Sequence, residues 1–67
     1  MERLRAARLK AGLSQEQAAE RLRRNQSYVS RSESGERRVD LVEALEFAAA
    51  YGVALEGILP VLKNDGS

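Results

Sequence analysis

Two residue types that often stabilise a small domain or carry out its chemistry are missing from this chain of 67 residues. It has no cysteine, so neither a disulfide framework nor a thiolate metal site can stabilise it. It has no histidine either, which removes the commonest metal ligand and the commonest general base. A chain of this length forms at most one domain with a small core. Its stability must therefore come from close helix packing, to which self-association can add.

Long apolar segments and catalytic motifs are missing too. No apolar stretch follows the charged N-terminal residues, as one would in a secretory signal. The most apolar region, residues 47–62, is too broken to span a membrane. It is interrupted by Gly52, Glu56, Gly57 and Pro60. No glycine-rich phosphate loop, nucleophile elbow or metal-ligand cluster is visible. We therefore expect a cytoplasmic protein that has no membrane segment, is not an enzyme and needs no cofactor or metal.

Charge is distributed unevenly along the chain. The formal net charge is only +1, but residues 1–38 hold ten of the eleven Lys and Arg residues and carry a net charge of +5. Residues 39–67 carry a net charge of −4. This asymmetry is typical of a protein with one face directed at a polyanion such as nucleic acid. A solvated surface of uneven charge is the alternative.

The sequence pattern predicts only helices. Apolar positions at helical spacing and helix-end signals predict five short helices, at residues 2–11, 15–22, 26–34, 41–51 and 53–59. Capping boxes mark the start of the second helix (Ser14 with Gln17) and of the fourth (Asp40 with Glu43). Asn25 is expected to cap the third helix. The fold class is therefore all-α, with one compact domain over residues 1–62 and a flexible tail at residues 63–67.

The second and third predicted helices are separated by a turn of three or four residues, which is typical of a helix-turn-helix. In that unit the second helix of the pair lies in the major groove of DNA. Its polar residues, Gln26, Ser27, Ser30 and Arg31, lie near its start, while Val29 faces inward. Glutamine can pair with adenine and arginine with guanine at two points each, and each pair is worth ~1–3 kcal/mol of discrimination.

In this order and spacing, residues 13–22, 26–31, 33–35 and 48–53 resemble the lambda-repressor-like (XRE or Cro type) family of helix-turn-helix transcriptional regulators. The resemblance covers about residues 4–59. It implies a compact five-helix fold with the helix-turn-helix at helices 2 and 3. It also implies a sequence-specific double-stranded DNA-binding regulator, for which we expect repression rather than activation.

The resemblance also implies roles for individual residues. The positions that read base edges are Gln26, Ser27 and Arg31. The positions near phosphate are Gln15, Asn25, Tyr28, Ser34, Arg37 and Arg38. Arg8 and Glu33 match a buried structural ion pair. The family's dimer interface falls on Leu55, Ile58, Leu59 and Leu62, which implies a homodimer on an inverted-repeat operator.

Several positions have a second interpretation. Tyr28 fits the edge of the core as well as a phosphate contact. Arg31 could pair with a nearby glutamate, and Arg37 and Arg38 could belong to a solvated loop. The competing function is a protein-interaction helical module, or an antitoxin-like partner, on the same fold. A toxin or another regulator would then be the protein partner.

Three residues depart from the family pattern. Arg23 stands where many relatives have glycine, so it must adopt a left-handed backbone conformation at some cost or extend the second helix. Arg24 stands where an apolar residue often follows, and it is either a phosphate contact or solvent-exposed. Ser32 replaces a large apolar residue, so we expect thin packing beneath the third helix.

Overall fold

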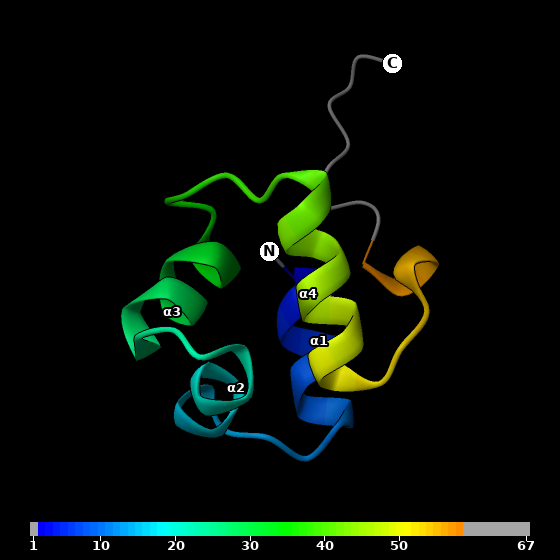
Figure 1. The fold of residues 1–67 in the computed structure, drawn as a ribbon, viewed down its shortest axis with the longest axis horizontal. Helices are drawn as coiled ribbons and strands as arrows, with labels where there is room; N and C mark the ends of the chain where they lie inside the picture. The colour runs from blue at the N-terminus through cyan, green and yellow to red at the C-terminus, as the bar shows by residue number, and fades with distance from the viewer. Residues whose placement is uncertain (1, 59–67) are drawn as a thin grey trace.

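A computed structural model describes residues 2–58, which form four α-helices and one short 3₁₀ turn, with no strand among them (Figure 1). The helices are α1 (Glu2–Lys10), α2 (Gln15–Leu22), α3 (Gln26–Ser34) and α4 (Leu41–Tyr51), followed by η1 (Leu55–Gly57). The prediction of an all-helical fold is confirmed. No helix in this part of the chain is long and apolar enough to cross a membrane.

The fifth helix predicted at residues 53–59 is not found as an α-helix in the described part of the chain. Within the described residues this segment forms only the three-residue turn η1. Ala54 precedes it without a side-chain cap, and Gly57 ends it. A single turn with no cap and a glycine gains too few hydrogen bonds to offset the cost of starting a helix. The predicted domain limit at residue 62 and the tail at residues 63–67 lie outside the described residues.

Local hydrogen bonds explain where α2 and α4 begin. The Ser14 hydroxyl accepts from the backbone N–H of Gln17 at 3.0 Å, and the Gln17 side chain accepts from the backbone N–H of Ser14 at 2.9 Å. Asp40 and Glu43 form the same reciprocal pair at 2.8 and 3.2 Å. Asn25 differs from the prediction, because it precedes α3 but its side chain makes no cap hydrogen bond. Asn25 therefore leaves the first N–H groups of α3 without the cap acceptor that was expected, and no other described side chain accepts from them.

Three helix ends share one backbone motif. Gly12, Arg23 and Gly52 follow α1, α2 and α4 with φ angles of 76°, 59° and 67°. After α2, the backbone N–H of Arg24 donates to the carbonyl of Ala19 at 3.0 Å, which closes the six-residue turn typical of this motif. Arg23 therefore adopts the left-handed conformation, one of the two outcomes predicted for it, and does not extend α2.

The core lies where α1, α2 and α3 meet α4. α2 packs against α3 and α4, and α1 packs against the same two helices. The largest fully buried side chains are Leu4, Val29, Ser32, Phe47 and Ile58. In Figure 1, α2 and α3 lie on one side of α4 and η1 lies on the other. α1 and α4 therefore lie against one side of the pair formed by α2 and α3.

Burial reduces the number of predicted dimer-interface residues that are exposed. Ile58 is fully buried, so its side chain belongs to the core. Leu55 is partly buried and packs against the same core. Leu59 and Leu62 lie outside the described residues. η1 packs against α4, which the spacing of four leucine and isoleucine residues does not indicate. The dimer interface itself stays a prediction.

Candidate nucleic-acid interface

α3 presents a polar face to solvent. Gln26, Ser27 and Arg31 are all exposed, whereas Val29 on the opposite face is fully buried. The turn before α3 spans only residues 23–25, so α2 and α3 form a closely connected helix pair (Figure 1). The structure thus brings the three predicted base-reading residues together on one exposed face.

A buried ion pair ties this helix pair to α1. Arg8 Nε donates to Glu33 Oε2 at 2.6 Å, and Arg8 Nη2 donates to Glu33 Oε1 at 3.2 Å. Arg8 Nη1 donates to the carbonyl of Leu13 at 2.8 Å. The hydrogen bond to Glu33 raises the pKa of Arg8 above its ordinary value. Arg8 and Glu33 therefore form the ion pair expected of them, and it joins α1, the loop before α2 and the last turn of α3.

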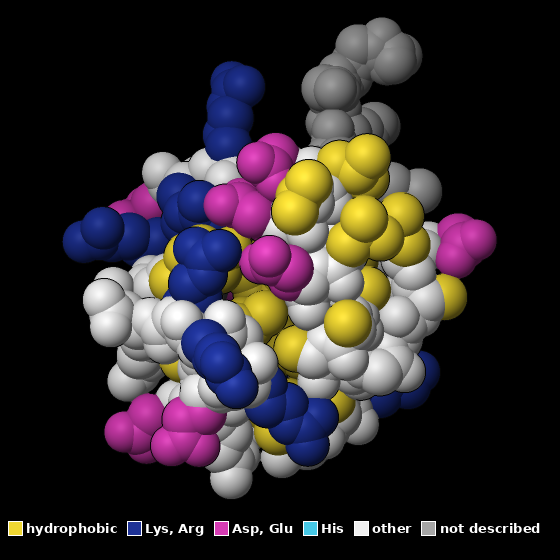
Figure 2. Space-filling model, viewed as in Figure 1, with side chains coloured by type: hydrophobic (Ala, Val, Ile, Leu, Met, Phe, Trp, Pro, Cys, Tyr) yellow, Lys and Arg dark blue, Asp and Glu magenta, His cyan; other side chains and the backbone are white. Residues whose placement is uncertain are grey.

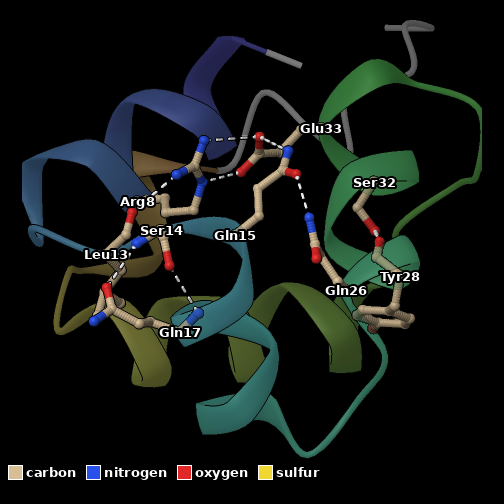
Figure 3. Close-up of polar contacts among 9 residues, drawn as sticks. All are labelled: Arg8, Leu13, Ser14, Gln15, Gln17, Gln26, Tyr28, Ser32 and Glu33. Atoms are coloured by element: carbon tan, nitrogen blue, oxygen red, sulfur yellow. Dashed lines mark hydrogen bonds and ion pairs between the residues drawn. The ribbon is translucent and has the colours of Figure 1, made fainter.

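Two glutamine side chains extend this ion pair to the surface (Figure 3). Gln15 Nε2 donates to Glu33 Oε1 at 3.2 Å. Gln26 Nε2 in turn donates to Gln15 Oε1 at 3.3 Å. Gln15 is partly buried and Gln26 is exposed, so the series leads from the core to the outer face of α3.

Tyr28 lies at the edge of the core. Its ring stacks on Phe47 with centroids 5.7 Å apart, and the guanidinium groups of Arg24 and Arg37 lie 4.5 and 4.3 Å from its centroid. Its hydroxyl is buried and has no hydrogen-bond partner among the described residues. Burial raises the pKa of Tyr28. Of the two interpretations of Tyr28, the structure places it in the core-edge position, and a phosphate could reach its hydroxyl only after a neighbouring side chain moved.

Acidic residues of α4 hold the arginines around Tyr28. Arg37 donates to both carboxylate oxygens of Glu43, at 3.2 and 2.9 Å. These hydrogen bonds raise the pKa of Arg37 and lower the pKa of Glu43. Arg24 lies 3.5 Å from Glu46 in a more exposed pair. Arg37 is therefore already engaged within the protein, so a phosphate would have to share it with Glu43.

Ser32 fits its buried position through hydrogen bonds. Its hydroxyl donates to the backbone carbonyl of Tyr28 at 2.7 Å and accepts from Arg37 Nη1 at 3.3 Å. A large apolar side chain would fill this space but could satisfy neither group. The expected thin packing is therefore compensated by a link between α3 and the loop that follows it.

A notch of about 270 Å³ opens at the start of α3. It is lined by Arg24, Asn25, Ser27, Tyr28, Arg31 and Arg37. Three of these side chains are guanidinium groups, which bind phosphate through paired N–H donors. The notch also lies at the N-terminus of α3, where the helix dipole favours an anion. Figure 2 shows basic side chains gathered on this side of the molecule, next to the acidic ones of α4. The chemistry of the notch suits a phosphate group.

Two further residues predicted to contact phosphate, Ser34 and Arg38, lie at the end of α3 and in the loop after it. Ser34 is exposed at the end of α3, and its hydroxyl donates to the carbonyl of Arg31 at 3.2 Å. Arg38 is exposed and forms no ion pair with the described residues. Arg31 and Glu36 are 3.9 Å apart and both highly exposed, so this pair holds Arg31 only weakly. Neither Ser34 nor Arg38 lines the notch.

Two features of this surface were not predicted from the sequence. One is the stacking of Arg24 and Arg37 on Tyr28, for which the pattern of apolar residues contains no signal. The other is an exposed apolar patch on α4, formed by Leu41, Val42 and Leu45, whose exposed fractions are 55%, 63% and 49% (Figure 2). The spacing of these three residues is a signal for it, because it places them on a face of α4 away from Ala44 and Phe47.

Comparison with protein-family models gives a match to a helix-turn-helix domain over residues 2–58. The comparisons with curated proteins and with solved structures give no match. The matched range includes all four helices and η1, and therefore both halves of the α2–α3 pair. This chain belongs to the helix-turn-helix domain family.

Proposed function

We propose that this protein is a sequence-specific double-stranded DNA-binding transcriptional regulator, acting as a repressor, that reads the major groove with α3. One observation carries the proposal. The outer face of α3 presents Gln26, Ser27 and Arg31 to solvent directly beside an arginine-lined notch. Reading of the major groove requires a helix whose side chains can hydrogen-bond to base edges. Groups that bind phosphate must lie next to it.

The proposal divides the residues by task. Gln26, Ser27 and Arg31 contact base edges and set the sequence preference. The notch, with Asn25 and Arg24 on its wall, takes one backbone phosphate. The other phosphate contacts are assigned to Gln15, Ser34, Arg37 and Arg38, and Tyr28 supports Arg24 and Arg37 from the edge of the core. Among these, Arg38 is exposed and unpaired within the described residues, while Arg37 acts in partnership with Glu43.

Selection of bound duplexes from a randomised DNA library at near-physiological salt tests the proposal. We expect wild type to enrich one sequence. Arg31→Ala should then relax the preference at one base pair, because it removes a base contact worth ~1–3 kcal/mol. Arg38→Ala should weaken binding to all sequences equally and reduce the slope of log affinity against log salt by about 1. Equal effects of the two variants on every duplex would contradict the assignment.

We further propose that the protein binds as a homodimer on an inverted repeat. One nine-residue reading helix offers few contacts, and two such helices about 34 Å apart double them. The proposed interface keeps Leu55, Leu59 and Leu62 and omits Ile58, which is fully buried. In sedimentation experiments, Leu62→Glu should shift wild-type dimer to monomer, whereas Leu45→Glu on the α4 patch should not. The opposite result would move the interface to α4.

The α4 patch supports one alternative function. Leu41, Val42 and Leu45 are exposed together, which suits a protein-interaction module whose partner is a toxin or another regulator. The library experiment separates the two functions. If wild type enriches no sequence and binds DNA only weakly, in a salt-dependent way, DNA reading fails and the protein-partner function takes its place.

A further inference from the structure

We infer that Glu33, a buried residue that does not reach the surface of α3, determines which base Gln26 prefers. This inference rests on the proposed function, since it concerns how α3 would read DNA. The structure links Glu33 to Gln26 through Gln15, with one hydrogen bond on each side of the Gln15 amide. Glu33 is thus a positioning residue for base recognition, in addition to its ion pair with Arg8.

The orientation of the Gln15 amide follows from its two neighbours. Glu33 Oε1 is held by Arg8 Nη2 at 3.2 Å and can only accept hydrogen bonds. Gln15 must therefore turn its Nε2 toward Glu33, which points its Oε1 toward Gln26. If the Gln15 amide were rotated by half a turn, its oxygen would face the Glu33 carboxylate oxygen, and the two would repel each other.

The orientation of Gln15 then sets that of Gln26. With an oxygen facing it, Gln26 uses one N–H of its Nε2 to donate to Gln15 Oε1 at 3.3 Å. One further N–H and the Oε1 acceptor remain for DNA. This donor–acceptor pair matches adenine, which offers an acceptor at N7 and a donor at N6 in the major groove. If the Gln15 amide turned, Gln26 would turn with it and present two N–H donors, which match the N7 and O6 acceptors of guanine.

Replacement of Glu33 by its amide is the direct test. In Glu33→Gln, residue 33 can present either an oxygen or an NH₂ group to Gln15. Both orientations of the Gln15 and Gln26 amides then become accessible. If they are equally populated, affinity for the preferred base falls only about twofold, while affinity for the competing base rises. We expect the preference at that base pair to drop from roughly 5- to 150-fold to within about threefold. Loss of structure would lower affinity for both duplexes instead.

A swap variant separates positioning from simple disruption. In Gln15→Glu/Glu33→Gln the carboxylate and the amide exchange places, so Gln26 again faces only an acceptor. We expect the original preference to return, although the new negative charge near the DNA backbone lowers affinity for every duplex. Gln15→Met removes the hydrogen bonds that link Glu33 to Gln26 and leaves the Arg8–Glu33 pair intact. It should also reduce the preference, and it keeps the inference testable if Glu33→Gln does not fold.

The measurement is competition binding of the full chain to duplexes that differ at one base pair, with thermal unfolding to show that each variant is folded. The base pair is identified as the one at which Gln26→Ala loses its preference. A folded Glu33→Gln that keeps the wild-type preference, or a Gln15→Met that does so, overturns the inference while the proposed function stands. If wild type itself prefers no sequence, the proposed function fails, and the inference fails with it.

Discussion

Arg23 occupies a backbone position that glycine fills in the two equivalent turns of this protein. Its φ of 59° matches those of Gly12 and Gly52, and its own N–H and that of Arg24 make the same turn hydrogen bonds. A side chain in this conformation costs about 1–2 kcal/mol. Glycine would remove that strain but would give the unfolded chain about 0.5–1 kcal/mol more conformational freedom. Arg23→Gly should therefore raise the free energy of unfolding by up to about 1.5 kcal/mol, and by about 0.75 kcal/mol at the midpoint of these ranges.

Thermal and urea unfolding followed by circular dichroism measure this change. For a domain of this size, about 0.75 kcal/mol corresponds to an increase in Tm of about 3–6 °C. The matched control is Gly52→Ala. A Cβ at Gly52 would meet no atom within 4 Å, so its cost is conformational alone, and Tm should fall. The exposed Arg23 side chain makes no hydrogen bond or ion pair with the described residues, so no specific polar contact is lost. A Tm that falls in both variants would refute the strain argument.

Three further predictions concern the groups around the interface. Tyr28→Phe removes a buried hydroxyl without a partner, so stability should be unchanged or higher, and DNA affinity should stay within about twofold; a larger loss would show that the hydroxyl contacts phosphate. Because Arg37 lowers the pKa of Glu43 from 4.5, this pair stabilises the fold above that pH, and its contribution is lost as the pH falls through the lowered value. Urea midpoints of wild type and Glu43→Gln should therefore differ at pH 7 and converge in acid, and a constant difference would contradict the pairing. Arg8→Met leaves the Glu33 carboxylate buried without its cation and should cost about 3–5 kcal/mol, measured as a lower urea midpoint.

The helices could be predicted because their signals are local. The capping boxes at Ser14 and Asp40 join residues only three apart, so the residues that form them are visible in the sequence itself. The glycines that end α1 and α4 also act through their own backbone. Asn25 shows the limit of such signals. Asparagine is a residue type that suits a cap, but the Asn25 side chain makes no cap hydrogen bond. The residue type alone cannot show whether the side chain will form that bond.

The interface could be predicted only in part, for a related reason. Placing Gln26 and Arg31 on the exposed face of α3 needs only helical periodicity and one inward residue, Val29. The environment of Tyr28 depends on ion pairs between distant parts of the chain, such as that of Arg24, in the turn after α2, with Glu46 of α4. Periodicity carries no information about which of several exposed charges will meet. The packing of α2 against α4, together with the stacking of Tyr28 on Phe47, decides it.

This packing also changes the interpretation of the uneven charge. The basic first part of the chain and the acidic second part do not form two separate surfaces at the interface, because Glu43 and Glu46 of α4 lie against Arg37 and Arg24. Glu43 holds the Arg37 guanidinium over the Tyr28 ring through two hydrogen bonds, whereas the more exposed pair with Glu46 holds Arg24 only weakly. A phosphate that binds there would meet a guanidinium group that is already in position. It would have to share the positive charge of that group with a carboxylate. If the protein binds DNA as proposed, we therefore expect the arginines around Tyr28 to determine the position and register of the DNA more than the total affinity, and exposed cations outside the notch to supply more of the affinity.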